Sequence, residues 1–398
     1  MNRIPILALA LVMAGAGCGT SAGGADDRDP GPDAADTAGA PGDASTDLPG
    51  DVPGDLPADV SADVVTLRHF AVGVFEQDFE DKTRKTPANG TAAEKPSRAL
   101  PTQVWYPAQG DPAATDAVEG APPDLSGAPY PLILFVHGSS GTRIAYSWFG
   151  QGLARAGYVV AAADFPLTSL MTDGGASDWH VEDQPADLSF LASSLFAGSP
   201  DGLPAGALDE PRGYAVAGHS TGGTVSLLAA FRDESQFPHD RRVAAAIDLS
   251  GDACFFAPAF FAPDPTVPLL AVGASRDFYV PAPNNVVYTY ENARSPKNLV
   301  VLKGGSHLWF TDWDVPDDQG VTPTQPEDPL AKTLESLCGG TGCSPVPAAA
   351  DDPPLGVEAQ HALTVAWARA FLDSVMRGES AGLDTLRAAP EPRIDARW

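Results

Sequence analysis

The sequence predicts an α/β protein built on a doubly wound, mostly parallel β-sheet with helices on both faces. Two observations lead to this prediction. Short and almost wholly apolar runs, of which Pro131–Val136 is the strongest, are typical of strands buried on both faces. These runs alternate with segments of helical spacing, which indicates strand–helix–strand crossovers between parallel strands.

Residues 1–18 predict an export signal. Arg3 supplies a positive charge, and the apolar or small residues 4–17 are too few to span a bilayer, which takes about 20 residues. The small residues before Cys18 resemble the lipobox of bacterial lipoproteins, although Gly15 stands where leucine is usual. This resemblance implies that Cys18 is lipidated and that the protein is anchored in the bacterial envelope. The alternative is a secreted protein cleaved near Gly17.

Residues 19–63 form a segment of a different composition. It is rich in Asp, Pro, Gly and Ala, it has no aromatic residue, and it repeats as DLPG, DVPG, DLPA and DVSA from Asp47 to Ala62. Such a segment cannot bury enough apolar area to offset its chain entropy. We therefore expect a disordered tether between the signal and the folded part.

The folded part is expected as one domain over residues 64–378, with a C-terminal extension over 379–398. The expected strands are 69–75, 100–106, 131–136, 158–163, 213–217, 243–249, 268–272 and 298–302. The expected helices are 145–156, 186–196, 222–231 and 357–376, and residues 165–184 form an irregular insertion. No repeat of 20 to 50 residues is present, which argues against solenoids and propellers.

Charge excludes several classes of function. The 398 residues hold 52 acidic against 24 basic side chains, a net charge of −28, and no basic stripe is visible. Nucleic acids and other polyanions are bound by Lys and Arg that displace counterions, so neither is expected as a partner. No Cys/His cluster has the spacing of zinc ligands, and we expect no metal and no cofactor.

The cysteines fit an oxidising compartment. Cys338 and Cys343 are separated by four residues and can close a small loop as a disulfide. Cys254 is then either a buried thiol or the partner of one of those two cysteines.

Residues Gly218–Gly222 fit the pattern G-x-S-x-G, directly after an apolar strand and before a helix. A serine on such a sharp turn has a strained backbone, and the flanking glycines let neighbouring chain pass close while Oγ projects outward. Ser220 is therefore the candidate nucleophile. The N–H of Thr221, at the helix N-terminus, would point toward a developing oxyanion.

A serine nucleophile needs a base and an orienting acid, and both follow in the expected order. The strand 268–272 leads to Asp277, and the next strand leads to His307. Both residues follow carboxyl ends of strands, where such sheets place their ligands. A second oxyanion N–H is expected at Ser139, in the glycine-bearing turn after strand 131–136, with His137 in a structural role.

These motifs resemble the α/β-hydrolase superfamily. HGSSG, GHSTGG, GASRDFYVP and GGSH together look like the branch of dienelactone hydrolases, platelet-activating-factor acetylhydrolases and cutinase-like polyester hydrolases. The resemblance implies a serine esterase with Ser220, Asp277 and His307 as its triad. In the acetylhydrolases the acid follows the preceding strand, which makes Asp248 the alternative to Asp277.

The expected function is hydrolysis of carboxylic esters, small or polymeric, through an acyl-enzyme. Amide or peptide cleavage by the same triad is one alternative, and a non-catalytic binding lipoprotein on the same fold is another. Membrane contact is expected through the lipid anchor only, and the oligomeric state is left open.

Several aromatic side chains have two interpretations each. Phe255, Phe256, Phe260 and Phe261 could line an acyl pocket or belong to the core. The same alternatives hold for Trp309, Phe310 and Trp313. Trp179 and His180 could form a lid or lie in a solvated loop.

Overall fold

The structure is a computed structural model that describes residues 69–177, 181–198, 202–231, 240–261, 267–313, 315, 351–388 and 391–398. The chain divides into two units, Met1–Val64 and Val65–Trp398. The fold described below is that of the second unit. The expected signal, Cys18 and the expected tether lie outside the described residues.

The second unit is made of ten strands and six α-helices among the described residues. The strands are β1 (Ala71–Asp81), β2 (Arg98–Ala108), β3 (Val118–Glu119), β4 (Leu132–Val136), β5 (Val159–Ala163), β6 (Tyr214–His219), β7 (Val243–Leu249), β8 (Leu269–Ala274), β9 (Lys297–Leu302) and β10 (Ile394–Arg397). The helices are α2 (Ser147–Arg155), α3 (Gln184–Phe196), α4 (Thr221–Phe231), α5 (Val286–Asn292), α7 (Val357–Leu372) and α8 (Ala381–Ala388).

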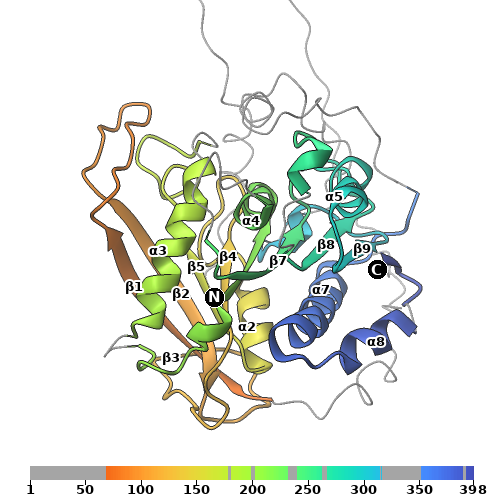
Figure 1. Cartoon of the computed structure of the whole chain (residues 1–398), viewed down its shortest axis with the longest axis horizontal. Helices are drawn as coiled ribbons and strands as arrows, with labels where there is room; N and C mark the ends of the chain where they lie inside the picture. The colour runs from red at the N-terminus through yellow and green to blue at the C-terminus, as the bar shows by residue number, and fades with distance from the viewer. Residues whose placement is uncertain are drawn as a thin grey trace, which may run out of the picture. The chain divides into compact units, whose positions relative to one another are not determined.

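All ten strands form one sheet, in the order β10-β9-β8-β7-β6-β4-β5-β2-β1-β3 (Figure 1). The six strands from β9 to β5 are parallel to their neighbours. β2 pairs antiparallel with β5, β1 pairs antiparallel with β2, and β10 pairs antiparallel with β9. The predicted fold class, a mostly parallel sheet in an α/β protein, is confirmed.

Both faces of the sheet are buried, because alternate residues of each strand point to opposite sides. In β4, Leu132 and Leu134 belong to one apolar core, and Ile133 and Phe135 belong to the other. The first core also contains apolar residues of α3 and α4, and the second contains those of α2, α7 and α8. The helices therefore cover both faces (Figure 1), which leaves the ends of the strands as the accessible part of the sheet.

The C-terminal segment differs from the expectation. Residues 379–398, expected as an extension beyond the domain, contain α8 and β10. β10 adds to the edge of the sheet through the pairing of Ile394 with Leu302. The folded unit thus extends to Trp398.

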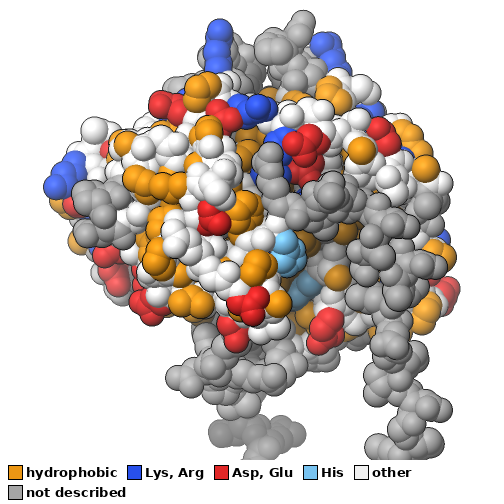
Figure 2. Space-filling model, turned by 90° about the horizontal axis from the view of Figure 1, so that it is seen from below, with side chains coloured by type: hydrophobic (Ala, Val, Ile, Leu, Met, Phe, Trp, Pro, Cys, Tyr) orange, Lys and Arg blue, Asp and Glu red, His pale blue; other side chains and the backbone are white. Residues whose placement is uncertain are grey.

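Acidic and hydrophobic side chains are interspersed over the face of the molecule drawn in Figure 2, and histidine side chains lie in a hollow between them. In the described part of the chain, no helix combines the length and the apolar character needed to cross a bilayer.

Candidate active site

The parallel strands bring the chemically active residues to one edge of the sheet. Ser220 follows β6, Asp277 follows β8, and the β9 strand leads to His307. Because these strands run in the same direction, their carboxyl ends lie at the same edge. The three residues come from positions up to 87 places apart in the sequence.

Ser220 is the single residue between β6 and α4, and its backbone has a left-handed conformation with φ 56°. Non-glycine residues rarely adopt this region, which costs about 1 to 3 kcal/mol. The turn is held by two backbone hydrogen bonds. The Ser220 N–H donates to the Leu249 carbonyl at 2.9 Å, and the Ser220 carbonyl accepts the Thr224 N–H at 3.1 Å.

The two glycines of the pattern are required by close backbone packing. A Cβ on Gly218 would overlap the Gly222 carbonyl, and a Cβ on Gly222 would overlap the Val136 carbonyl. β4, β6 and the start of α4 therefore approach so closely that only glycine fits. This packing explains the spacing that the sequence shows around Ser220.

His307 and Asp277 form a buried pair. His307 Nδ1 lies 2.8 Å from Asp277 Oδ2, and the two side chains are 5% and 0% exposed. The other carboxylate oxygen, Oδ1, accepts the N–H groups of Tyr279 at 3.0 Å and Val280 at 2.6 Å. These bonds fix the carboxylate and hold the imidazole with Nδ1 toward Asp277 and Nε2 on its other side.

The imidazole of His307 packs beside the turn that carries Ser220. Its ring lies 4.5 Å from the ring of His219, the residue before the candidate nucleophile, and 5.2 Å from the ring of Tyr279. The structure thus brings the predicted base next to the predicted nucleophile turn and pairs it with the predicted acid.

Asp248, the alternative acid, has different partners. It is fully buried at the end of β7, and its Oδ1 accepts the Gly251 N–H at 2.8 Å. Burial, together with the charge of Asp252, raises the pKa of Asp248 to about 8. His307 is paired with Asp277, so the geometry favours Asp277 over Asp248.

His137 anchors the loop that follows β4. Its Nδ1 donates to the Gly138 carbonyl at 2.7 Å, and its Nε2 accepts the Phe165 N–H at 3.2 Å. Burial lowers the pKa of His137, which keeps the ring neutral and able to make both bonds. Its structural role agrees with the interpretation from the sequence.

The backbone of this loop lies against the nucleophile. A Cβ on Gly138 would stand 3.1 Å from the Ser220 Cβ. The N–H groups of Gly138 and Ser140 donate to the Tyr146 hydroxyl and to the Thr168 carbonyl, both at 2.9 Å. Ser139 lies between these two residues in the chain, and its role as an oxyanion donor stays a prediction.

Tyr146 is a site residue that the sequence did not reveal. Its hydroxyl accepts the Gly138 N–H and lies 3.1 Å from Nδ1 of His219. The side chain is 2% exposed, and burial raises the pKa of its hydroxyl well above the usual range. It links the loop after β4 to the residue before Ser220. No sequence pattern indicates this link, because it depends on three segments that meet only in the fold.

The aromatic residues after β7 belong to the core. Phe255, Phe256 and Phe261 are fully buried, and the Phe256 and Phe260 rings stack at 4.1 Å. Of the two interpretations, core packing is therefore the one that the structure supports.

After His307, the residues Trp309 and Phe310 are buried as well, and Phe310 lies 5.3 Å from the His219 ring. Phe310 therefore packs against His219, the residue before the candidate nucleophile.

Cys254 is disulfide-bonded, so its interpretation as a buried thiol is wrong. The predicted pair of Cys338 and Cys343 lies outside the described residues, as do Trp179 and His180. Among the described residues, no group of three or more His, Cys, Asp or Glu could hold a metal ion.

Comparisons with known proteins found one matching family model and similar solved structures. Residues 108–173, which contain the loop after β4, match the family model "Platelet-activating factor acetylhydrolase, isoform II". A ferulic acid esterase from Streptomyces cinnamoneus has a similar structure, with a TM-score of 0.56 and 24% sequence identity over 85% of this chain and 99% of that chain. No curated protein matches the sequence.

Proposed function

We propose that the chain is a member of the α/β-hydrolase superfamily and that it hydrolyses carboxylic esters with Ser220 as the nucleophile. One observation carries the proposal. A serine in a left-handed turn at the carboxyl edge of the sheet lies beside a buried His307–Asp277 pair. This arrangement supplies a nucleophile, a base and an orienting acid at one place.

The first half of the reaction forms an acyl-enzyme. Ser220 Oγ attacks the ester carbonyl carbon while His307 Nε2 takes the hydroxyl proton. The tetrahedral oxyanion accepts hydrogen bonds from the N–H groups of Thr221 and Ser139. The C–O bond to the alcohol then breaks, and the alcohol leaves with the proton held by His307.

The second half releases the acid. A water molecule gives a proton to His307 and attacks the acyl carbon, and the second oxyanion is held by the same N–H groups. The bond to Ser220 Oγ breaks, and the serine recovers its proton. Asp277 orients the imidazole and stabilises the positive charge that forms on it.

Two features support an ester rather than an amide as substrate. The family model that matches residues 108–173 is named for an acetylhydrolase, and the structural neighbour is named as an esterase. Amide cleavage by the same residues is the second candidate, since the triad alone does not distinguish the two bonds. Rates on matched ester and anilide substrates separate the two functions.

The test is hydrolysis of p-nitrophenyl acetate by the wild type and by Ser220→Ala. Removal of the nucleophile is expected to lower kcat by about 10⁴-fold or more. Ser226→Ala is the matched control, because it removes a buried hydroxyl from α4, the helix that follows Ser220, where this hydroxyl donates to the Gly222 carbonyl. Equal activity of wild type and Ser220→Ala would refute the proposal.

We also propose that the protein is exported and anchored through a lipid on Cys18, on the strength of the small-residue run before that cysteine. Cys18→Ser is expected to shift the protein from the membrane fraction to the soluble fraction of the cells that produce it. An unchanged distribution would contradict the anchor.

A further inference from the structure

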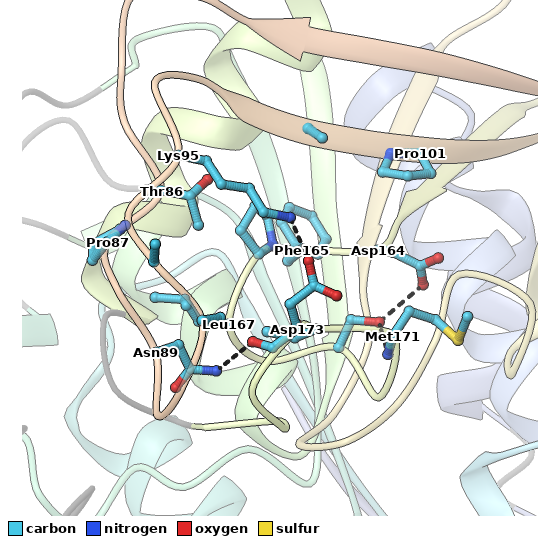
Figure 3. A pocket seen from close by; sticks show the side chains of 16 residues that line it. Thr86, Pro87, Asn89, Lys95, Pro101, Asp164, Phe165, Leu167, Met171 and Asp173 are labelled. Atoms are coloured by element: carbon cyan, nitrogen blue, oxygen red, sulfur yellow. Dashed lines mark hydrogen bonds and ion pairs between the residues drawn. The ribbon is translucent and has the colours of Figure 1, made fainter.

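A pocket of about 200 Å³ lies between the hairpin that leads into β2 and the segment after β5 (Figure 3). One wall is the hairpin between β1 and β2, with Thr86, Asn89 and Lys95. The opposite wall is the segment after β5, with Phe165, Leu167 and Met171. Nothing in the proposed mechanism uses this pocket.

The two walls are joined by polar contacts, so the pocket is a fixed part of the fold. Asn89 Nδ2 donates to the carbonyls of Asp173 at 3.0 Å and Gly175 at 2.6 Å. Lys95 Nζ lies 2.7 Å from Asp173 Oδ2, and Figure 3 shows this ion pair between the two walls. Further along the hairpin, Arg84 bonds the buried Asp187 of α3.

The segment after β5, which forms the second wall of the pocket, is hydrogen-bonded to the loop that approaches Ser220. The Ser140 N–H donates to the Thr168 carbonyl at 2.9 Å, and the Leu170 N–H donates to the Gly141 carbonyl at 3.0 Å. β2, which forms the pocket floor with Pro101, is three strands from β6. At about 4.8 Å per strand, β2 and β6 are about 14 Å apart within the sheet.

The chemistry of the pocket favours a neutral, apolar ligand. Its two carboxylates are both paired, Asp164 with Arg143 and Asp173 with Lys95. The remaining lining is mostly apolar, and Met171 is 69% exposed at its edge.

Two more apolar side chains are exposed on the segments that connect the pocket to the loop beside Ser220. Leu170 is 40% exposed in the segment after β5, and Ile144 is 52% exposed just after the loop that approaches Ser220. Large apolar side chains that are exposed on adjoining segments favour a binding surface.

We propose that this pocket binds the neutral apolar end of an extended ester, alkyl or aryl, while the scissile bond lies at Ser220. The inference rests on the proposed function and adds a substrate class to it. Esters that reach the pocket are preferred over acetates, and each methylene that enters it raises kcat/KM about fourfold, which corresponds to about 0.8 kcal/mol.

The experiment measures kcat/KM over two ester series in the full chain. One series lengthens the acyl chain of p-nitrophenyl esters, and the other lengthens the alcohol of acetate esters. The series in which the preference appears identifies the side of the ester that enters the pocket. A preference in either series supports the inference, and a flat profile in both overturns it.

Ala92→Phe fills the pocket from the hairpin, and Ala88→Phe is the matched control on an exposed position of the same hairpin that does not line it. Ala92→Phe lowers kcat/KM for the longest preferred ester about tenfold and leaves p-nitrophenyl acetate within about twofold. Met171→Glu, at an exposed position that tolerates charge, gives the same selective loss and covers the case in which Ala92→Phe fails to fold.

Two failures are distinguishable. Ester hydrolysis that depends on Ser220 but keeps its chain-length profile in Ala92→Phe and Met171→Glu overturns the pocket inference alone. Absence of any Ser220-dependent ester hydrolysis overturns the proposed function, and the pocket inference with it.

Discussion

Asp277 and Asp248 are both buried acids at the carboxyl edge, and their partners separate their roles. Asp277 is bonded to His307, whereas Asp248 is bonded to the Gly251 backbone. We expect Asp277→Asn to lower kcat about 10⁴-fold, because the amide favours the wrong imidazole tautomer. Asp248→Asn should keep kcat within about threefold of the wild type. Steady-state kinetics of both variants decides the assignment, and the reverse pattern would transfer the role to Asp248.

Asp248 should also make stability depend on pH. Burial raises its pKa to about 8 in the folded state, against about 3.9 in an unfolded chain. Between these values the folded state holds one more proton than the unfolded state, so the free energy of unfolding falls as the pH rises from about 4 to about 8. The slope is up to about 1.4 kcal/mol per pH unit for this group.

Urea unfolding at pH 5, 6, 7 and 8 measures this effect. Asp248→Asn retains an acceptor for the Gly251 N–H and has no charge to bury. We expect the variant to lose the corresponding part of the slope and to exceed the wild type in stability at pH 8. Identical slopes for the two proteins would show that Asp248 does not titrate in this range.

Tyr146 is expected to position the loop after β4 against the nucleophile turn. Tyr146→Phe leaves the Gly138 N–H and His219 Nδ1 without the hydroxyl that joins them. We expect kcat to fall about tenfold with KM unchanged, because small displacements of catalytic groups are costly. Tyr106→Phe removes another buried hydroxyl, bonded to the Ala121 carbonyl, and controls for stability. Equal kcat losses in both variants would reduce Tyr146 to a structural role.

At the residue scale, the sequence points to candidate site residues where the chemistry has a local pattern. The spacing around Ser220 and the position of His307 after a strand follow from short motifs. Sequence alone leaves both Asp277 and Asp248 as candidates, because Asp277 follows β8 and Asp248 lies at the end of β7, the neighbouring strand in the sheet. Tyr146 could not be predicted, since its contacts come from segments far apart in the chain.

At the scale of elements, one buried ion pair joins β2 to α3. Arg98 donates to both carboxylate oxygens of Asp187 at 2.7 Å and 2.6 Å, and the two side chains are 1% and 0% exposed. Asp187→Ala leaves the buried guanidinium without its main partner and should destabilise the fold by about 3 to 5 kcal/mol. Chemical denaturation measures this loss.

The control is Glu94→Ala, which breaks the exposed Lys85–Glu94 pair between the two sides of the hairpin that leads into β2. An exposed pair of this kind contributes at most about 1 kcal/mol. If both variants lost the same small amount, the buried pair would not hold β2 against α3.

The predicted elements differ from the observed ones for identifiable reasons. The continuous apolar runs β4, β5, β7 and β8 are strands as expected, because burial on both faces leaves a strong signal. β10 was missed because only Ile394 of its four residues is buried. The hairpin of β1 and β2 is antiparallel, and periodicity alone does not report the direction of pairing.

At the scale of the whole molecule, every residue of the candidate site and of the pocket lies in the unit Val65–Trp398. The net charge of −28 disfavours anionic substrates, and the paired charges of the pocket favour a neutral one. A neutral ester with an apolar end is consistent with both properties.

The most direct test of this account is to trap the nucleophile. The full chain is treated with a fluorophosphonate, and the modified residue is located by mass spectrometry of its peptides. We expect one adduct per chain, on Ser220, with ester hydrolysis lost in proportion to labelling and no adduct in Ser220→Ala. Ester hydrolysis that continues after complete labelling, or an adduct on another residue, would contradict the account.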